Sequence, residues 1–243
     1  ITDDWKAYKH YLSEVKPAFH PHVLFVGHDS SEIENIALMS LGGILHHMNG
    51  SANYALVGEG NINILSDIIS KKQPEWIGFN LYTGLTDYVF DWIKKYKIER
   101  ASFILKKTIS DFDTADKALK NMVRETNGPI YDGNQIIYAP VIIGGHFNNY
   151  SFEESFCKGG DYVVRGKGIN ILRDILLGLY SPGIYHDPMP YANIPRMDRE
   201  AFFKDMYEFS DKTKGYVVSR IKSVLTALGC SYTCSYCYIS SLI

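Results

Sequence analysis

Short apolar runs that end near glycine alternate with amphipathic stretches along most of this chain, and this alternation most constrains its fold. Five runs read as strands buried on both faces, over residues 23–27, 54–58, 76–82, 140–145 and 162–166. Apolar residues at helical spacing follow them, over residues 32–48, 62–72, 86–96, 152–157 and 169–179. The pattern predicts an α/β fold: a Rossmann-like or flavodoxin-like parallel sheet with helices on both faces.

The predicted sheet domain covers residues 23–181, and a helical segment precedes it over residues 1–22. Ser30 or Ser31 is the expected N-cap of the first helix of the domain, because a hydroxyl can accept from the free N–H groups there. Residues 99–139 look like an insertion between the third helix and the fourth strand. Their role is open, although one stretch of them, 114–125, has a helical pattern.

The character of the chain changes after the fifth predicted helix. Residues 182–215 contain four prolines, which suits an extended linker between two domains. Strand-like residues return at 216–226 and lead directly into three cysteines. Residues 216–243 are therefore expected to begin a second domain. The chain starts with Ile1, so the sequence is expected to be part of a longer protein.

Charge and hydropathy argue against some classes of protein. The chain has 25 Lys and Arg against 27 Asp and Glu, a net charge of −2, so no broad nucleic-acid or membrane footprint is expected. It has no apolar run of about 18 residues, the length that predicts a membrane-spanning helix. It also shows no signal peptide, and a cytoplasmic location is expected.

Cys230, Cys234 and Cys237 form a C-x3-C-x2-C run within the last fourteen residues of the 243-residue chain. Thiolates bind soft metals and iron–sulfur clusters. Three thiolates on one loop would leave one iron of a 4Fe–4S cluster open to a substrate or cofactor. A zinc site, which usually has four ligands, and three incidental thiols remain alternatives. The remaining cysteine, Cys157, is interpreted as a packed or idle thiol.

This spacing, with Tyr236 before the last cysteine, resembles the signature of the radical S-adenosylmethionine (radical SAM) superfamily. The resemblance implies that Cys230, Cys234 and Cys237 hold a 4Fe–4S cluster whose open iron binds SAM. Tyr236 would lie beside the adenine. Reductive cleavage of SAM would give a 5′-deoxyadenosyl radical. Residues 223–228 would be the first strand of a β/α barrel that the sequence truncates, so the isolated chain is expected to be inactive.

In open parallel sheets, ligands bind beyond the carboxyl ends of the strands. The candidate binding residues are therefore those in the turns after the third, fourth and fifth predicted strands. They are Asn80, Tyr82, Thr83, Gly84, Gly144, Gly145, His146, Phe147, Gly166 and Gly168. The dinucleotide fingerprint G-x-G-x-x-G is incomplete at every turn, which disfavours a nicotinamide or flavin dinucleotide.

The order of these elements resembles the cobalamin-binding domain that precedes the barrel in cobalamin-dependent radical SAM enzymes. The matching segments are P-x-W-I-G-F-N at 74–80, Gly144-Gly145, and V-V-R-G-x-G at 163–168. The resemblance implies that the turn residues named above bind cobalamin. The D-x-H-x-x-G motif, which supplies a histidine to cobalt in other cobalamin proteins, is absent. The lower cobalt ligand stays open, with His28 and His146 interpreted mainly as hydrogen-bonding residues.

The resemblance implies a cobalamin-dependent radical SAM enzyme with three cofactors: a 4Fe–4S cluster, SAM and cobalamin. Methyl transfer to an unactivated carbon is the expected reaction, and cyclisation and oxidation are alternatives. Expected partners are a small-molecule or peptide substrate and an electron donor such as flavodoxin or ferredoxin. Two further alternatives are a radical SAM enzyme whose sheet domain binds no cobalamin and a non-catalytic cobalamin-binding module.

Overall fold

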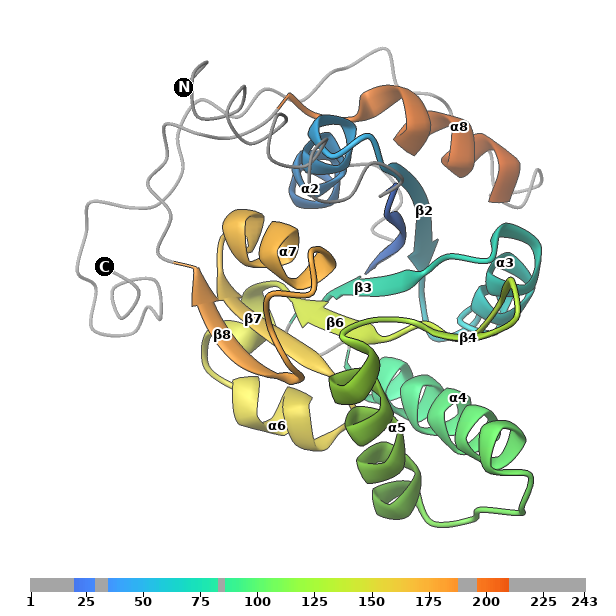
Figure 1. Ribbon diagram of the computed structural model, residues 1–243. Coiled ribbons are helices and arrows are strands. Elements are labelled where there is room, and N and C mark those ends of the chain that lie inside the picture. The colour runs from blue at the N-terminus through green and yellow to red at the C-terminus, as the bar shows by residue number, and fades with distance from the viewer. Residues whose placement is uncertain (1–19, 29–34, 83–85, 188–195, 210–243) are drawn as a thin grey trace.

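The computed structural model describes residues 20–28, 35–82, 86–187 and 196–209, and its centre is a six-stranded sheet (Figure 1). The strands are β1 (His22–His28), β2 (Ser51–Val57), β3 (Trp76–Asn80), β6 (Val141–Gly144), β7 (Tyr162–Gly166) and β8 (Gly183–Asp187). All neighbours pair in parallel, in the order β2-β1-β3-β6-β7-β8. This confirms the predicted α/β class, and the first five strands follow a flavodoxin-like order.

Helices cover both faces of the sheet (Figure 1). They are α2 (Ile36–His47), α3 (Ile64–Lys72), α4 (Asp87–Leu105), α5 (Phe112–Thr126), α6 (Phe152–Cys157), α7 (Ile169–Leu176) and α8 (Arg199–Phe209), with a 3-10 turn, η1 (His146–Asn149). α2 and α7 contact each other on one face, and α4, α5 and α6 lie against the other. All five residues of β3 and the five central residues of β1 are buried. The core therefore lies on both sides of the central strands, as continuous apolar runs predict.

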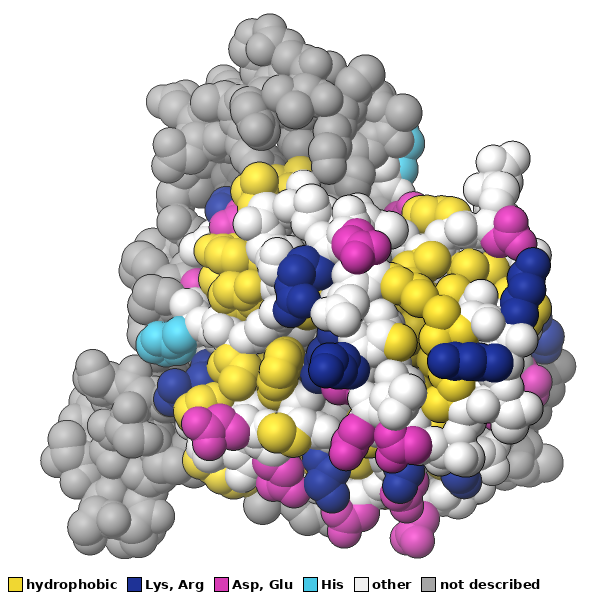
Figure 2. Space-filling view, turned by 60° about the horizontal axis from the view of Figure 1, so that its bottom comes forward, with side chains coloured by type: hydrophobic (Ala, Val, Ile, Leu, Met, Phe, Trp, Pro, Cys, Tyr) yellow, Lys and Arg dark blue, Asp and Glu magenta, His cyan; other side chains and the backbone are white. Residues whose placement is uncertain are grey.

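The predicted insertion at 99–139 contains more regular structure than its sequence pattern indicated. α4 extends through Leu105 into it, and α5 confirms the helix expected at 114–125. After α5 the chain forms an antiparallel hairpin of β4 (Ile130–Asp132) and β5 (Gln135–Tyr138), which was not predicted. Figure 2 shows the face that α4–α6 cover, where basic, acidic and apolar side chains are interspersed.

Two predictions, one for the start of the first helix and one for the linker at 182–215, are wrong. The N-cap of α2 is Asn35, whose side chain accepts from the backbone N–H of Leu38, and neither Ser30 nor Ser31 has this role. Asn35 lies nearer the apolar stripe of the helix and is as good a capping residue as serine. The extended-linker prediction for 182–215 also fails over much of its length. This segment contains β8 and α8, which both pack on the sheet domain.

α8 covers the outer edge of β2. Its Asp205 carboxylate accepts hydrogen bonds from the Tyr54 backbone N–H (2.8 Å) and from Asn53 Nδ2 (2.8 Å). Asp198, just before the helix, accepts from the Tyr54 hydroxyl (3.0 Å) and lies 3.1 Å from His46 Nε2 of α2. The outer edge of β2 thus bonds through its Tyr54 N–H to a carboxylate of α8, which hinders further strand addition there.

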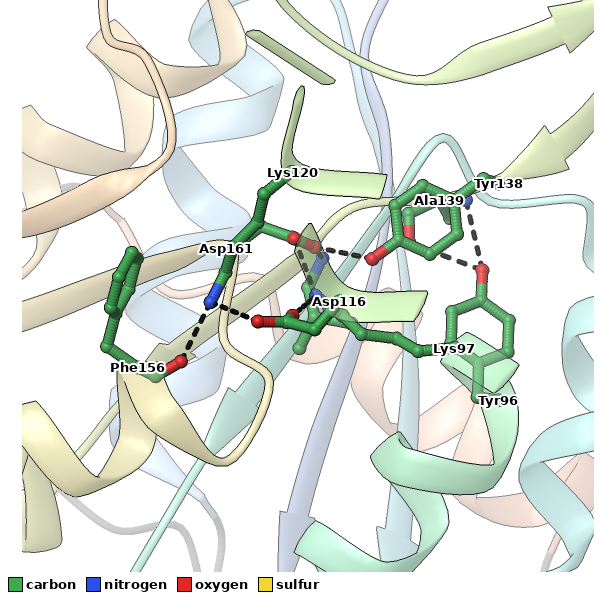
Figure 3. Close-up of polar contacts among 9 residues, drawn as sticks. Tyr96, Lys97, Asp116, Lys120, Tyr138, Ala139, Phe156 and Asp161 are labelled. Atoms are coloured by element: carbon green, nitrogen blue, oxygen red, sulfur yellow. Dashed lines mark hydrogen bonds and ion pairs between the residues drawn. The ribbon is translucent and has the colours of Figure 1, made fainter. Parts of the chain in front are cut away.

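A buried network of charges joins α4, α5 and the amino ends of β6 and β7 (Figure 3). The Lys97 side chain is fully buried, and its Nζ lies 2.6 Å from one carboxylate oxygen of Asp116 and of Asp161. Asp161 also accepts from the Tyr138 hydroxyl (2.6 Å) and the Val141 N–H (2.7 Å). Lys120 donates to Asp116 (2.8 Å), so two cations face two anions and the buried charge is balanced.

Burial shifts the acid–base equilibria of this network. Desolvation, followed by repulsion from Lys97, lowers the pKa of Lys120. Desolvation raises the pKa of Tyr96 to about 12, and it raises the pKa of Tyr138 well above its usual value, with a further contribution from the Asp161 carboxylate. Both hydroxyl groups are therefore neutral in the folded protein at neutral pH.

Replacing Asp161 with Asn should lower the free energy of unfolding by about 3–5 kcal/mol, because Lys97 then keeps only Asp116 as a buried counter-charge. Urea denaturation followed by circular dichroism measures the change. Asp132→Asn is the matched control, since Asp132 is exposed on β4 and its substitution should cost less than about 0.5 kcal/mol. Equal effects of the two substitutions would show that the network contributes nothing to stability.

Raising the pH from about 9 to about 11 should also destabilise the protein. Unfolded tyrosines ionise near pH 10, whereas folded Tyr96 and Tyr138 keep their protons, so the unfolded state binds fewer protons and stability falls. Between the pKa of the unfolded state and that of the folded state, each such tyrosine lowers the free energy of unfolding by up to about 1.4 kcal/mol per pH unit. Urea denaturation at several pH values measures the slope. Tyr96→Phe should make it shallower, and an unchanged slope contradicts this assignment.

Candidate functional site

The strand order reverses at β1, and a depression opens beside it at the carboxyl edge of the sheet. The chain runs from β1 to β2 on one side and later to β3 on the other, so the loops after β1 and β3 diverge. The depression has a volume of about 230 Å³, its open mouth included. It is lined by Val26, Gly27, His28, Val57, Phe79, Asn80, Leu81, Tyr82, Tyr88 and Val89.

Most of this lining is apolar, and the polar groups are few. Pockets that enclose a whole small ligand usually measure about 300–1,000 Å³. The enclosed part of the depression is only about 10 Å³, so it is a shallow hollow with room for about one water molecule. Asn80 and Tyr82, both predicted as binding residues, are part of its wall.

Asn80 is held in place by two neighbours. Its Nδ2 lies 3.3 Å from the Tyr82 hydroxyl and 3.4 Å from Asn35 Oδ1. Asn35 Oδ1 also accepts from the Leu38 N–H (3.1 Å), so the residue that begins α2 is tied to the depression. Sequence reasoning missed Asn35 as a member of this site. The signal available was its position as a capping residue directly before an apolar helix.

Tyr82 and His146 form an aromatic pair at the same edge. Their ring centroids lie 5.5 Å apart with planes inclined by 29°, a stacked arrangement. His146 is exposed at the start of η1, after β6, while Tyr82 follows β3. The structure thus brings together two predicted residues from different turns. His28 lies on the other side, at the end of β1, and lines the depression.

Gly144 and Gly145 have different surroundings. A Cβ atom on Gly144 would meet only backbone oxygens of Phe79 and Val164, both at 4.0 Å, so the surface above it is open. Gly145 has φ +101°, and a Cβ there would lie 2.4 Å from Asn80 Oδ1 and 2.5 Å from the Leu81 carbonyl oxygen. Gly145 therefore lets the two turns pack closely, and its contacts are with the protein itself.

Phe147, Gly166 and Gly168 lie further from the depression. Phe147 is buried, and its ring packs against those of Phe90 and Tyr150. Gly166 ends β7, and its N–H donates to Asn149 Oδ1 (3.2 Å). Gly168 is the N-cap of α7. The predicted residues thus form one group around β3 and η1 and a second group at β7.

Several predicted site residues lie outside the described part of the chain. They are Thr83, Gly84, Cys230, Cys234, Tyr236 and Cys237. Within the described residues, no group of three or more His, Cys, Asp or Glu side chains could hold a metal ion. Cys157 is exposed on α6.

Comparisons of this chain with protein-family models, with curated proteins and with solved structures found no match. None of the helices in the described ranges combines the length and apolarity needed to cross a membrane.

Gly145→Ala should destabilise the protein by at least about 2 kcal/mol, because an alanine there is strained at φ +101° and would displace Asn80 and Leu81. Thermal and urea unfolding measure the loss. Gly58→Ala is the control, since nothing lies within 4 Å of its would-be Cβ, and it should change stability by less than about 0.5 kcal/mol. A Gly145→Ala protein as stable as the control would contradict the packing role.

Proposed function

We propose that this chain is the cofactor-binding part of a cobalamin-dependent radical SAM enzyme, and that the reaction is methylation of an unactivated carbon. The observation that carries the proposal is the order of two features. A parallel sheet with open turns at its carboxyl edge precedes the C-x3-C-x2-C run of Cys230, Cys234 and Cys237. Each feature also occurs in proteins with other functions. Their order along one chain supports the proposed function.

The cysteine spacing supports a 4Fe–4S cluster with an open iron. Three thiolates within eight residues can reach three irons, and a fourth protein ligand is missing from the run. These residues lie outside the described part of the chain, so the assignment depends on their spacing and on Tyr236. In the proposed enzyme, SAM occupies the open iron and Tyr236 lies beside its adenine.

The residues at the carboxyl edge fit a large flat ligand. A side chain would find open space at Gly58 and Gly60 after β2, and a Cβ atom on Gly144 would meet only two backbone oxygens, at 4.0 Å. The stacked pair of Tyr82 and His146 offers a flat surface beside the shallow, mainly apolar depression. A corrin ring with amide side chains has this shape and chemistry.

When bound, SAM at the cluster and cobalamin would supply a carbon-centred radical and a methyl group, respectively. The described residues would bind and orient the cobalamin face and exclude water from it, because the edge is apolar apart from a few polar groups. A ferredoxin or flavodoxin is the proposed source of electrons, and a small molecule or peptide is the proposed substrate. Cyclisation and oxidation use the same cofactors and are the alternative reactions.

Anaerobic reconstitution with iron, sulfide and cobalamin tests the proposal. The wild-type chain should retain close to four iron atoms and one cobalt, as elemental analysis and absorption spectra measure. Cys234→Ala should lose most of the iron and keep the cobalt, because the two sites use different residues. Cys157→Ala is the matched control and should keep both, since Cys157 lies exposed on α6 of the sheet domain.

Each contrary result points to a different alternative. Iron without cobalt would leave a radical SAM enzyme whose sheet domain binds another molecule. Cobalt without iron would leave a non-catalytic cobalamin-binding module. Zinc in place of iron after purification would assign the cysteines to a structural metal site.

A further inference from the structure

Arg165 lies at the carboxyl edge of the sheet, near the end of β7. Its guanidinium carbon is 4.2 Å from the centre of the Phe152 ring of α6, a cation–π contact. The register places Ile143 opposite Val163, so Arg165 is level with Gly145. It is also on the same face of the sheet as Val163, since alternate residues of a strand share a face. This is the face that α4 and α6 cover.

The Arg165 cation lacks a counter-charge within the described residues. Its Nε atom is buried and has no hydrogen-bond acceptor there, and none of the ion pairs of that part of the chain includes it. The buried Nε is closed to an external ligand, so an anion would meet the two Nη nitrogens, which are not among the buried unpaired donors of the described residues. A planar guanidinium can hold an anion there with two hydrogen bonds. The stacking on Phe152 holds this fork in one orientation.

His186 lies beside Arg165. The two residues are register partners in the parallel pair of β7 and β8, so their side chains project from the same face. His186 is exposed, whereas Arg165 is half-buried. The neighbouring Asp187 side chain is used elsewhere, as it accepts from the Asn170 N–H at the start of α7. The edge of β7 and β8 therefore presents two nitrogen-bearing side chains together.

The distance from this pair to the depression fits a single ligand. β7 is two strands away from β3, and neighbouring strands lie about 4.8 Å apart, so the separation along the edge is roughly 10 Å. A cofactor whose ring system lies over Tyr82 and His146 could place an arm of that length beside Arg165. Phosphate is the anion that such arms carry in nucleotide-bearing cofactors, and its oxygens match the guanidinium fork.

We propose that Arg165, with His186 beside it, binds the phosphate of a cofactor whose ring system lies over the β3 end of the same edge. Cobalamin carries such a phosphate in its nucleotide arm, so the inference rests on the proposed function when cobalamin is the ligand. Flavin mononucleotide carries the same group on a different ring. The chemistry shared by both ligands is a phosphate about 10 Å from a flat ring.

The test compares ligands that possess or lack the phosphate arm, using the full chain. Cyanocobalamin is paired with dicyanocobinamide, which lacks the nucleotide arm, and flavin mononucleotide is paired with riboflavin. Equilibrium dialysis with absorbance detection gives the affinities. Arg165→Gln should weaken binding of the phosphate-bearing ligand by about tenfold to a hundredfold. It should change binding of the partner ligand by less than about twofold.

Lys158→Gln is the matched control. Lys158 follows α6 at its other end, and its Nζ lies 6.0 Å from the Phe90 ring, so the variant removes one cation near one aromatic ring. It should leave all four affinities within about twofold of the wild type. Arg165→Lys keeps the charge without the fork and should fall between wild type and Arg165→Gln.

The contrary outcomes are distinct. Equal weakening of both members of a pair by Arg165→Gln would assign Arg165 a purely structural role and overturn the phosphate subsite. Wild-type protein that binds cobinamide as tightly as cobalamin would overturn it without any variant. Phosphate-dependent binding of flavin mononucleotide alone would keep the subsite and overturn the cobalamin proposal. A chain that binds none of the four ligands would overturn both.

Discussion

The buried ion pair between Lys97 and Asp161 is the contact on which the arrangement of the helical layer depends. A fully buried ammonium is tolerated only with a counter-charge, and Lys97 has two, from α5 and from the start of β7. Asp161 also fixes the first residue of β6 through the Val141 N–H. These contacts join the amino ends of β6 and β7 to α4. The ion pair between Lys97 and Asp116 holds α5 against α4.

The carboxyl edge of the sheet contrasts with this ion-paired amino edge. Few polar groups line it, and the chain leads from β1 and from β3 to strands on opposite sides of this pair. The strand order reverses at β1, so the crossovers from β1 and β3 lead in opposite directions. Neither crossover covers the carboxyl ends of both strands, which leaves the depression between them. Rigidity at one edge allows the other to present a flat aromatic surface without loss of the fold. The position of a candidate binding site thus follows from topology before any residue is assigned to it.

The sequence allowed prediction of the strands that contain a run of apolar residues, and it failed for the short or half-exposed strands β4, β5 and β8. β3 and β7 read as continuous apolar runs because helices cover both faces. β8 alternates exposed and covered residues between prolines, and its pattern matched a linker. The topology has a further feature: α2 and α7 share a face although their crossovers lead toward opposite edges, so the two connections have opposite hands. Right-handed crossovers are the strong expectation, so one of these two connections is of the rare kind.

Charge compensation separates structural cations from a binding cation in this molecule. Lys97 is paired with two carboxylates, and Lys120 is paired with Asp116 and the Phe156 carbonyl oxygen. Arg165 stacks on the Phe152 ring and forms no ion pair within the described residues. Arg165 lies beside His186 near the carboxyl end of β7, so its position suits the proposed contact with an anion from outside the chain.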